Sequence, residues 1–180
     1  MKRLTILLDN DDVITTFIND LLNEYNETYS TNYLPKDITF WRINETLNLK
    51  ENIFDLITYD FLVNKVHEKN NSIHWIKTLI DNGHRVYIVS DTTEEQAQSG
   101  KRDWLLDRIP YFKKDHIIFI KNKGMINGDV FVDDNISNIR QWQEKNPNGK
   151  AILMRSNHNA NKPINDIPII DNLGDIYNYI

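Results

Sequence analysis

The chain has 180 residues, a length that fits one domain or one domain with a modest insertion and excludes a large multidomain protein. Its 21 Lys and Arg against 26 Asp and Glu give a net charge of −5, which argues against a nucleic-acid polymer as the main partner, because such polymers are bound by a basic excess. The absence of cysteine excludes disulfides, thiolate metal sites and cysteine nucleophiles.

The first predicted elements are a buried strand and a helix. Residues 4–8 (LTILL) form a nearly continuous apolar run that stops at Asp9, which is typical of a strand buried on both faces of a parallel sheet. From Val13 to Tyr25 apolar residues recur every three or four positions, which predicts an amphipathic helix. The apolar run is too short for a signal peptide or a membrane span, so we expect a cytoplasmic protein without a membrane partner.

Residues 30–71 interrupt this pattern with Pro35, clustered Asn and Glu, and several aromatic residues. A segment of this length without a strand signal indicates a small helical insertion rather than a loop, because long structureless loops are uncommon. The chain is therefore predicted to consist of a core, residues 1–29 and 72–180, and a helical insertion, residues 30–71.

After the insertion, predicted strands and helices alternate. Ser72 is expected to cap a helix that ends at Asn82 and Gly83. Further strands are expected at residues 86–89, 117–120, 130–132 and 151–154, and further helices around residues 104–106, 136–142 and 173–180. The alternation predicts an α/β fold, with a Rossmann-like parallel sheet flanked by helices.

Polar residues follow several of the predicted strands. In an open parallel sheet, ligands bind beyond the carboxyl ends of the strands. The candidate residues at these ends are Asp9, Asp11, Ser90, Asp91, Lys123, Asp133 and Asp134. Carboxylates that share one edge repel one another unless a cation joins them, and Mg²⁺ is the hard cation that combines a few carboxylates with water and phosphate. Lys123 and Ser90 would then face a phosphate, with Lys121 and Lys101 as alternatives to Lys123.

Four motifs along the chain resemble those of the haloacid dehalogenase-like (HAD) phosphatases. They occur in that family's order: LLDNDDV with Asp9, Asp11 and Val13, VYIVS with Ser90, then Lys123, and VFVDD with Asp133 and Asp134. The resemblance implies a helical cap at the insertion of residues 30–71. It also implies hydrolysis of a phosphomonoester through an aspartyl-phosphate.

The resemblance assigns a role to each motif. Asp9 would attack phosphorus, and Asp11 would act as general acid and base. Mg²⁺ would be held by Asp9, the backbone carbonyl of Asp11, and the motif-four residues Asp133 and Asp134. The phosphate would be bound by Ser90, Asp91 and Lys123.

A closer resemblance is to the 5′(3′)-deoxyribonucleotidases of this superfamily. Phe17 lies eight residues after Asp9, and Phe40 and Trp41 form a Phe-Trp pair in the cap, as in those enzymes. The resemblance implies a nucleoside monophosphate substrate, with pyrimidine deoxynucleotides favoured, and a base recognised by Phe17, Phe40 and Trp41. Asp12 departs from the family pattern, which has a small residue there.

Several alternatives stay open. The substrate could be another small phosphate ester, or the protein could be a non-enzymatic phosphoacceptor module similar to a receiver domain, although such modules lack an insertion of this size. Phe17 and the Phe40–Trp41 pair could serve packing alone. The five His residues are scattered without a ligand-like pair and are expected to be structural. A homodimer is one option for the oligomeric state.

Overall fold

The computed structural model describes residues 2–39, 42–160 and 164–180. Its core is a six-stranded sheet in the order β3-β2-β1-β4-β5-β6, in which every pair of neighbouring strands is parallel. The strands are β1 (Thr5–Leu8), β2 (Arg85–Ser90), β3 (Ile117–Phe119), β4 (Val130–Asp133), β5 (Lys150–Met154) and β6 (Ile169–Ile170). The predicted Rossmann-like α/β fold is confirmed.

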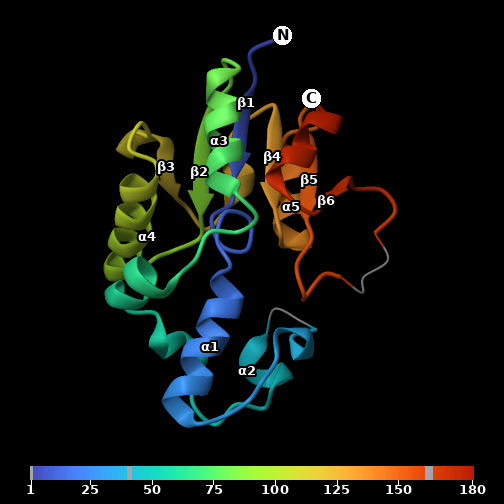
Figure 1. Cartoon of the computed structure of the whole chain (residues 1–180). Helices are drawn as coiled ribbons and strands as arrows, with labels where there is room; N and C mark the ends of the chain where they lie inside the picture. Colours follow the sequence, from blue (N-terminus) through green and yellow to red (C-terminus); the bar gives the residue numbers. More distant parts are fainter. Residues whose placement is uncertain (1, 40–41, 161–163) are drawn as a thin grey trace.

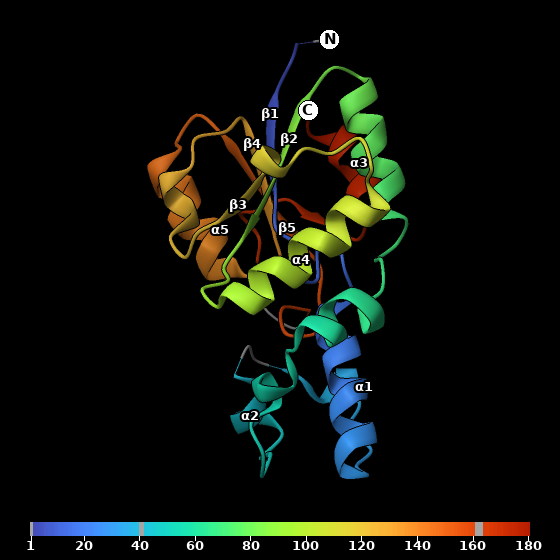
Figure 2. The same ribbon diagram turned by 90° about the vertical axis from the view of Figure 1, so that its left-hand side faces the viewer.

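Helices cover both faces of this sheet. The α-helices of the described residues are α1 (Phe17–Tyr29), α2 (Ile43–Thr46), α3 (Ser72–Asp81), α4 (Glu95–Arg108) and α5 (Ile136–Lys145), of which α1 and α2 lie beyond the sheet. Figure 2 views the sheet between α5 on one side and α3 on the other. Adjacent residues of β1 therefore enter different cores: Ile6 and Leu8 belong to the core under α3, whereas Leu7 packs with Trp142 of α5. This two-sided burial explains why the strand is a continuous apolar run.

Three predicted elements differ in the structure. The helix expected from Val13 begins at Phe17, because Asp12 has a φ of 55° and the chain makes a turn in which the N–H groups of Ile14 and Thr15 both donate to the Asn10 carbonyl. Ser72 is the first residue of α3 rather than its cap, and its Oγ donates to the Ile14 carbonyl at 2.7 Å. The C-terminal helix is a short 3₁₀ helix, Leu173–Asn178.

The insertion lies at the carboxyl end of the strands. Figures 1 and 2 show α1 extending away from the sheet beside α2. We propose, on this arrangement, that the cap unit begins at Phe17 rather than at residue 30. The two connections between core and cap run antiparallel, with Thr16 N–H donating to the His67 carbonyl at 3.0 Å and Lys69 N–H donating to the Ile14 carbonyl at 2.8 Å. The cap is thus attached by two short, hydrogen-bonded connections.

Helix α4 of the core is hydrogen-bonded to the last part of the insertion. Trp104 donates its indole N–H to the Val66 carbonyl at 2.8 Å, and Tyr59 donates its hydroxyl to Asp103 at 2.7 Å. Gly100 allows this close approach, since a Cβ there would lie 2.9 Å from the side chain of Leu62.

Within the described residues, no helix is long and apolar enough to cross a membrane.

Candidate active site

The site lies at the carboxyl edge of the sheet, where three neighbouring strands end in polar residues. Asp9 directly follows β1, Ser90 ends β2 and Asp133 ends β4. The Asp9 N–H still donates to the Val132 carbonyl at 2.9 Å, so the sheet's hydrogen bonding continues to the first acidic residue. The backbone of the sheet therefore fixes the position of this carboxylate.

Lys123 joins two of the carboxylates. Its Nζ lies 2.7 Å from Asp9 Oδ1 and 2.7 Å from Asp133 Oδ2, and the lysine is only 2% exposed. Burial alone would lower the pKa of Lys123, but the two carboxylates outweigh it and raise the pKa above the usual range. Lys123 is thus a permanent cation in the site, whereas Lys121 is exposed to solvent.

A second lysine, Lys101 of α4, binds the other side of the site. Its Nζ lies 2.5 Å from Asp11 Oδ2 and donates to Ser90 Oγ at 3.1 Å and Thr92 Oγ1 at 2.8 Å. Lys101 was considered in the sequence only as an alternative to Lys123, and the structure uses both. The sequence offered one indication of this role. Lys101 lies on the same helix face as the buried residues Ala97 and Trp104, where a lysine needs an anionic partner.

The carboxyl groups of the site are crowded together. Burial raises the pKa of Asp9 to about 7, and neighbouring carboxylates add to this effect although Lys123 opposes it. The pKa of Asp133 is also raised by burial, and that of Asp134 is raised well above its ordinary value by burial and by Asp12, Asp133 and Asp9. The site therefore lacks positive charge relative to its acidic groups.

This deficit fits a hard cation such as Mg²⁺. Asp9, Asp133 and Asp134 each offer a carboxylate oxygen within 4.8 Å of the others. Asp134 is 1% exposed, and its Oδ2 accepts no hydrogen bond from any part of the chain that the structure describes. Oxygen-only donors at this spacing suit Mg²⁺. Asp11 lies beside this group, but its carboxylate is bound to Lys101.

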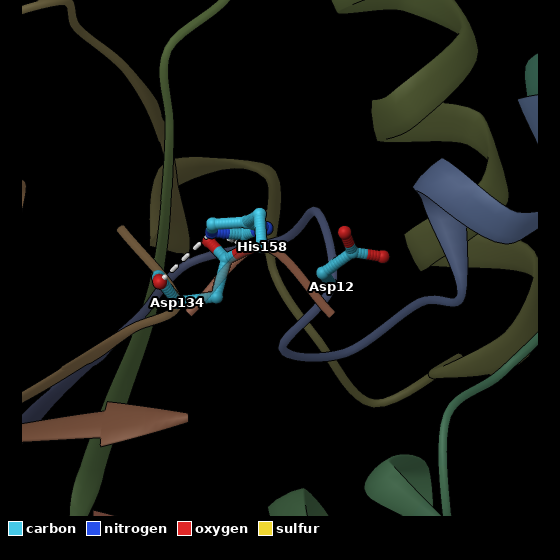
Figure 3. A group of neighbouring side chains, drawn as sticks. All are labelled: Asp12, Asp134 and His158. Atoms are coloured by element: carbon cyan, nitrogen blue, oxygen red, sulfur yellow. Dashed lines mark hydrogen bonds and ion pairs between the residues drawn. The ribbon is translucent and has the colours of Figure 1, made fainter. Parts of the chain in front are cut away.

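Asp12 and His158 lie next to Asp134 and were not predicted to belong to the site. Figure 3 shows His158 above Asp134, with Asp12 on the loop after β1. The three side chains offer donor atoms within 4.8 Å of one another. Burial raises the pKa of Asp12 to about 7. Asp12 Oδ1 accepts the Ile18 N–H at 3.1 Å, so this carboxyl group also fixes the start of α1.

Two adjoining cavities open at this edge. One, of about 240 Å³, is lined by Asp9, Asp11, Asp91, Thr93, Lys123, Asp134, Asn135 and Asn138. The other, of about 400 Å³, shares Asp11 and Asp91 with it and extends to Phe17, Phe54 and Lys101. A charged cavity for a small anion thus adjoins one with an aromatic wall.

The predicted base-recognition residues are only partly placed. Phe17 is buried but lines the larger cavity, packs edge-on to Phe61 with 6.1 Å between ring centroids, and lies under Lys101. Phe40 and Trp41 lie outside the described residues. Phe54, which the sequence did not single out, lines the same cavity. The sequence offers little indication that Phe54 lines a cavity, because it is one of several aromatic residues in the insertion and no spacing distinguishes it.

Known proteins with similar sequences are described as nucleotidases. Residues 3–180 match the family described as "5′ nucleotidase, deoxy (Pyrimidine), cytosolic type C protein". A 5′(3′)-deoxyribonucleotidase of Bacillus subtilis (strain 168) is 28% identical over 164 residues, which cover 90% of each chain. A 5′(3′)-deoxyribonucleotidase of Clostridium acetobutylicum is 26% identical over 167 residues, covering 90% of this chain and 87% of the relative.

Solved structures show the same fold. A HAD hydrolase of family IA, variant 3, from Entamoeba histolytica aligns with a TM-score of 0.61 at 14% identity, over 98% of this chain and 95% of that chain. YfnB of Bacillus subtilis, described as a HAD-hydrolase bound to magnesium, aligns with a TM-score of 0.62 at 16% identity, over 99% and 98%. The family match over nearly the whole chain and the shared fold lead to one conclusion: the chain belongs to the 5′-nucleotidase, deoxy (pyrimidine), cytosolic type C family, is a phosphoric monoester hydrolase and has the fold of the HAD hydrolases.

Proposed function

We propose that this protein is a Mg²⁺-dependent 5′(3′)-deoxyribonucleotidase that releases phosphate from deoxynucleoside monophosphates, with pyrimidine nucleotides preferred. The observation that carries the proposal is the pair of adjoining cavities, one lined by Asp9, Asp11, Lys123 and Asp134 and the other by aromatic side chains. The two sequence relatives described as 5′(3′)-deoxyribonucleotidases support the substrate class.

Asp9 is the nucleophile in this proposal. Lys123 Nζ and the Asn10 N–H, at 2.7 and 2.8 Å, both bind Oδ1 of Asp9. Among the described residues these are the donors to this carboxylate, so Oδ2 is the oxygen available to form a bond to phosphorus. The lysine at Oδ1 favours the ionised form, which a carboxylate nucleophile requires, against the burial that raises the pKa of Asp9 to about 7.

Asp11 is the general acid and the general base in this proposal. As Asp9 Oδ2 bonds to phosphorus, the P–O bond to the sugar breaks and Asp11 gives its proton to the departing oxygen. Water then attacks the aspartyl-phosphate, Asp11 takes a proton from that water, and the P–O bond to Asp9 breaks to release inorganic phosphate. The Asn10 side-chain amide orients Asp11 by donating to its Oδ1 at 2.9 Å, and Lys101 at Oδ2 favours the carboxylate form that accepts the proton from water.

The phosphoryl charge is met by Ser90, Lys101 and Lys123, which are all buried at the smaller cavity or beside it. Asp9, Asp133 and Asp134, with the backbone carbonyl of Asp11, would hold Mg²⁺, which supplies positive charge for phosphoryl transfer when bound. Asp91 stays a predicted phosphate-binding position. It is exposed at the rim of both cavities, where its carboxylate would repel the phosphate, so we expect any contact to come from its main chain.

The larger cavity would hold the base. Its aromatic wall, Phe17 and Phe54, provides faces on which a nucleobase stacks, and its polar lining includes Glu94 and Gln96, whose side chains could hydrogen-bond to the edge of a base. Phe40 and Trp41 remain predicted contributors.

The test is phosphate release from a panel of substrates: 5′- and 3′-deoxynucleoside monophosphates, ribonucleotides, sugar phosphates and p-nitrophenyl phosphate. Each is measured with Mg²⁺ and with EDTA, and Asp9→Asn serves as the inactive control. We expect the deoxynucleotides to give the highest kcat/KM and EDTA to abolish turnover. A higher kcat/KM for a sugar phosphate would contradict the substrate class, and full activity in EDTA would contradict the metal requirement.

A further inference from the structure

The loop that follows β5 reaches back to Asp134 at the end of β4. Its residues His158 and Asn159 are both buried, at 4% and 3% exposed. Asn159 Nδ2 donates to the Asp134 carbonyl at 2.8 Å and to the Met154 carbonyl at 2.8 Å, so it ties the main chains after β4 and β5 together. The main chain of Asp134 is therefore fixed by the neighbouring strand's loop.

His158 contacts both the main chain and the side chain of Asp134. Its Nε2 lies 3.2 Å from the Asp134 carbonyl oxygen and 3.4 Å from Asp134 Oδ2 (Figure 3). A single N–H that faces the carbonyl and the carboxylate of one residue restricts rotation of that side chain. At 3.4 Å the contact to Oδ2 is longer than an ordinary hydrogen bond, so the carboxylate keeps its capacity to bind a cation.

Ser156 contacts the imidazole of His158. Its Oγ lies 3.0 Å from Nδ1 and 3.2 Å from Nε2, so the hydroxyl is within reach of both ring nitrogens. With the proton on Nε2, the hydroxyl donates to Nδ1 and Nε2 donates to the Asp134 carbonyl. This is the tautomer in which His158 has a hydrogen to direct at Asp134.

The Asp134 carboxylate lies between two groups of side chains that could bind a metal ion. It offers an oxygen within 4.8 Å of Asp9 and Asp133, the group that fits Mg²⁺, and also within 4.8 Å of Asp12 and His158. The carboxylate is repelled by Asp9 and Asp133 on one side and by Asp12 on the other. The contact with His158 restricts the direction in which its oxygens face.

We propose that His158, in the tautomer that carries its proton on Nε2, is a positioning residue that holds the Asp134 carboxylate in the orientation that binds the metal. The proposal rests on the proposed role of Asp134 as a metal ligand. Groups hydrogen-bonded to metal ligands typically orient them, and their loss weakens metal binding. His158 therefore has a functional role, whereas the sequence predicted a structural one.

The test compares two variants of similar size. His158→Leu removes the donor, and His158→Gln keeps a side-chain N–H that reaches the Nε2 position. Binding of Mn²⁺ as a spin probe is measured by electron paramagnetic resonance on the full chain without substrate, together with the Mg²⁺ concentration that half-activates phosphate release. We expect His158→Leu to weaken Mn²⁺ binding by about 10- to 100-fold, and His158→Gln to restore most of that loss. Saturating Mg²⁺ should return kcat of His158→Leu toward the parent value.

Other outcomes are decisive as well. Unchanged Mn²⁺ binding by His158→Leu would overturn the positioning role. Equal losses in both variants, with equally lowered melting temperatures, would show that the ring acts by packing and would also overturn it. Asp134→Asn separates the two proposals: if it binds Mn²⁺ as the parent does, the metal ligand itself is wrongly assigned. If Asp134→Asn loses binding and His158→Leu does not, only the role of His158 fails.

Discussion

The site has two halves, one around Lys123 and one around Lys101, and they differ in their access to solvent. Lys123 lies between Asp9 and Asp133, and all three side chains are buried. Lys101 binds Asp11, whose side chain is 16% exposed, and lines the larger cavity. The Lys123 half is therefore the more deeply buried, closed half, and it borders only the smaller of the two cavities. The Lys101 half is the cavity-facing half, because it opens on the larger cavity, and we expect its charges to exchange partners when a phosphate enters.

This comparison predicts the largest effect at Asp9, the residue of the closed half that forms the covalent bond. Asp9→Asn keeps the shape but removes the nucleophile, so we expect kcat to fall by roughly 10⁴-fold or more. Asp11→Asn should keep phosphate binding and lose about 10²- to 10⁴-fold, the usual value of general acid-base help. Single-turnover phosphate release measures both. A near-normal rate for Asp9→Asn would show that another group attacks phosphorus.

The two lysines themselves give the next largest effect, on stability. Lys123→Met leaves two buried carboxylates without their cation, which costs about 3–5 kcal/mol in the free energy of unfolding. Lys101→Met should cost only about 1 kcal/mol, because Asp11 can turn toward water in the cavity. Urea denaturation in EDTA measures the difference. Equal costs would mean that the Lys101 half is as closed as the Lys123 half.

The residues of the site also differ in how well the sequence predicts their positions. Asp9, Ser90 and Asp133 were predicted to meet because each ends an apolar strand, and in a parallel sheet such ends share one edge. The structure brings them together, and their chemical roles stay predictions. The number of apolar residues in a strand is a local property, so it can be read from the sequence without knowing any long-range contact.

Lys101 and His158 depend on tertiary contacts instead. The direction in which Lys101 points follows from the packing of α4 on the core, and His158 lies in a loop without periodicity. Asp12 shows a further gap, since the turn at its positive φ delays the start of the helix from the predicted Val13 to Phe17, although the apolar pattern already begins at Val13. Periodicity reports which face is buried, but it does not report where a turn interrupts the backbone.

Asp12 gives the third prediction, which concerns pH. Its pKa is raised by burial from the ordinary 3.8 to about 7 in the folded protein. Between these values the unfolded chain releases the proton while the folded chain keeps it, so the folded state loses stability as the pH rises from about 4 to about 7. Asp12→Asn removes this loss and keeps an oxygen for the Ile18 N–H. At about pH 8 in EDTA, the variant should be more stable by up to about 4 kcal/mol, with little gain near pH 4.

Urea denaturation of both proteins at the two pH values provides the measurement. Asp9, whose pKa is raised in the same way, is present in both proteins, so the difference between them reports Asp12 together with its effect on Asp134, whose pKa Asp12 raises. A stability gain that is the same at both pH values would show that Asp12 is ionised throughout and that its burial does not control its titration.

The last prediction sharpens the cavity-facing half, where the base would bind. Phe54 is 37% exposed and lines the larger cavity. Stacking of a base on an aromatic ring is worth about 1–3 kcal/mol, so Phe54→Ala should lower kcat/KM for a deoxynucleoside monophosphate by roughly 5- to 150-fold. Hydrolysis of p-nitrophenyl phosphate depends on the charged cavity and should change little.

Leu34→Ala is the matched control, because Leu34 is also a large exposed apolar residue of the insertion, at 48% exposed, but does not line the cavity. It should leave both substrates unaffected. If Phe54→Ala slows both substrates equally, the ring supports closure of the cap over the charged half rather than contact with a base. The two halves would then be mechanically linked, and base recognition would have to come from Phe17 and the predicted Phe40–Trp41 pair.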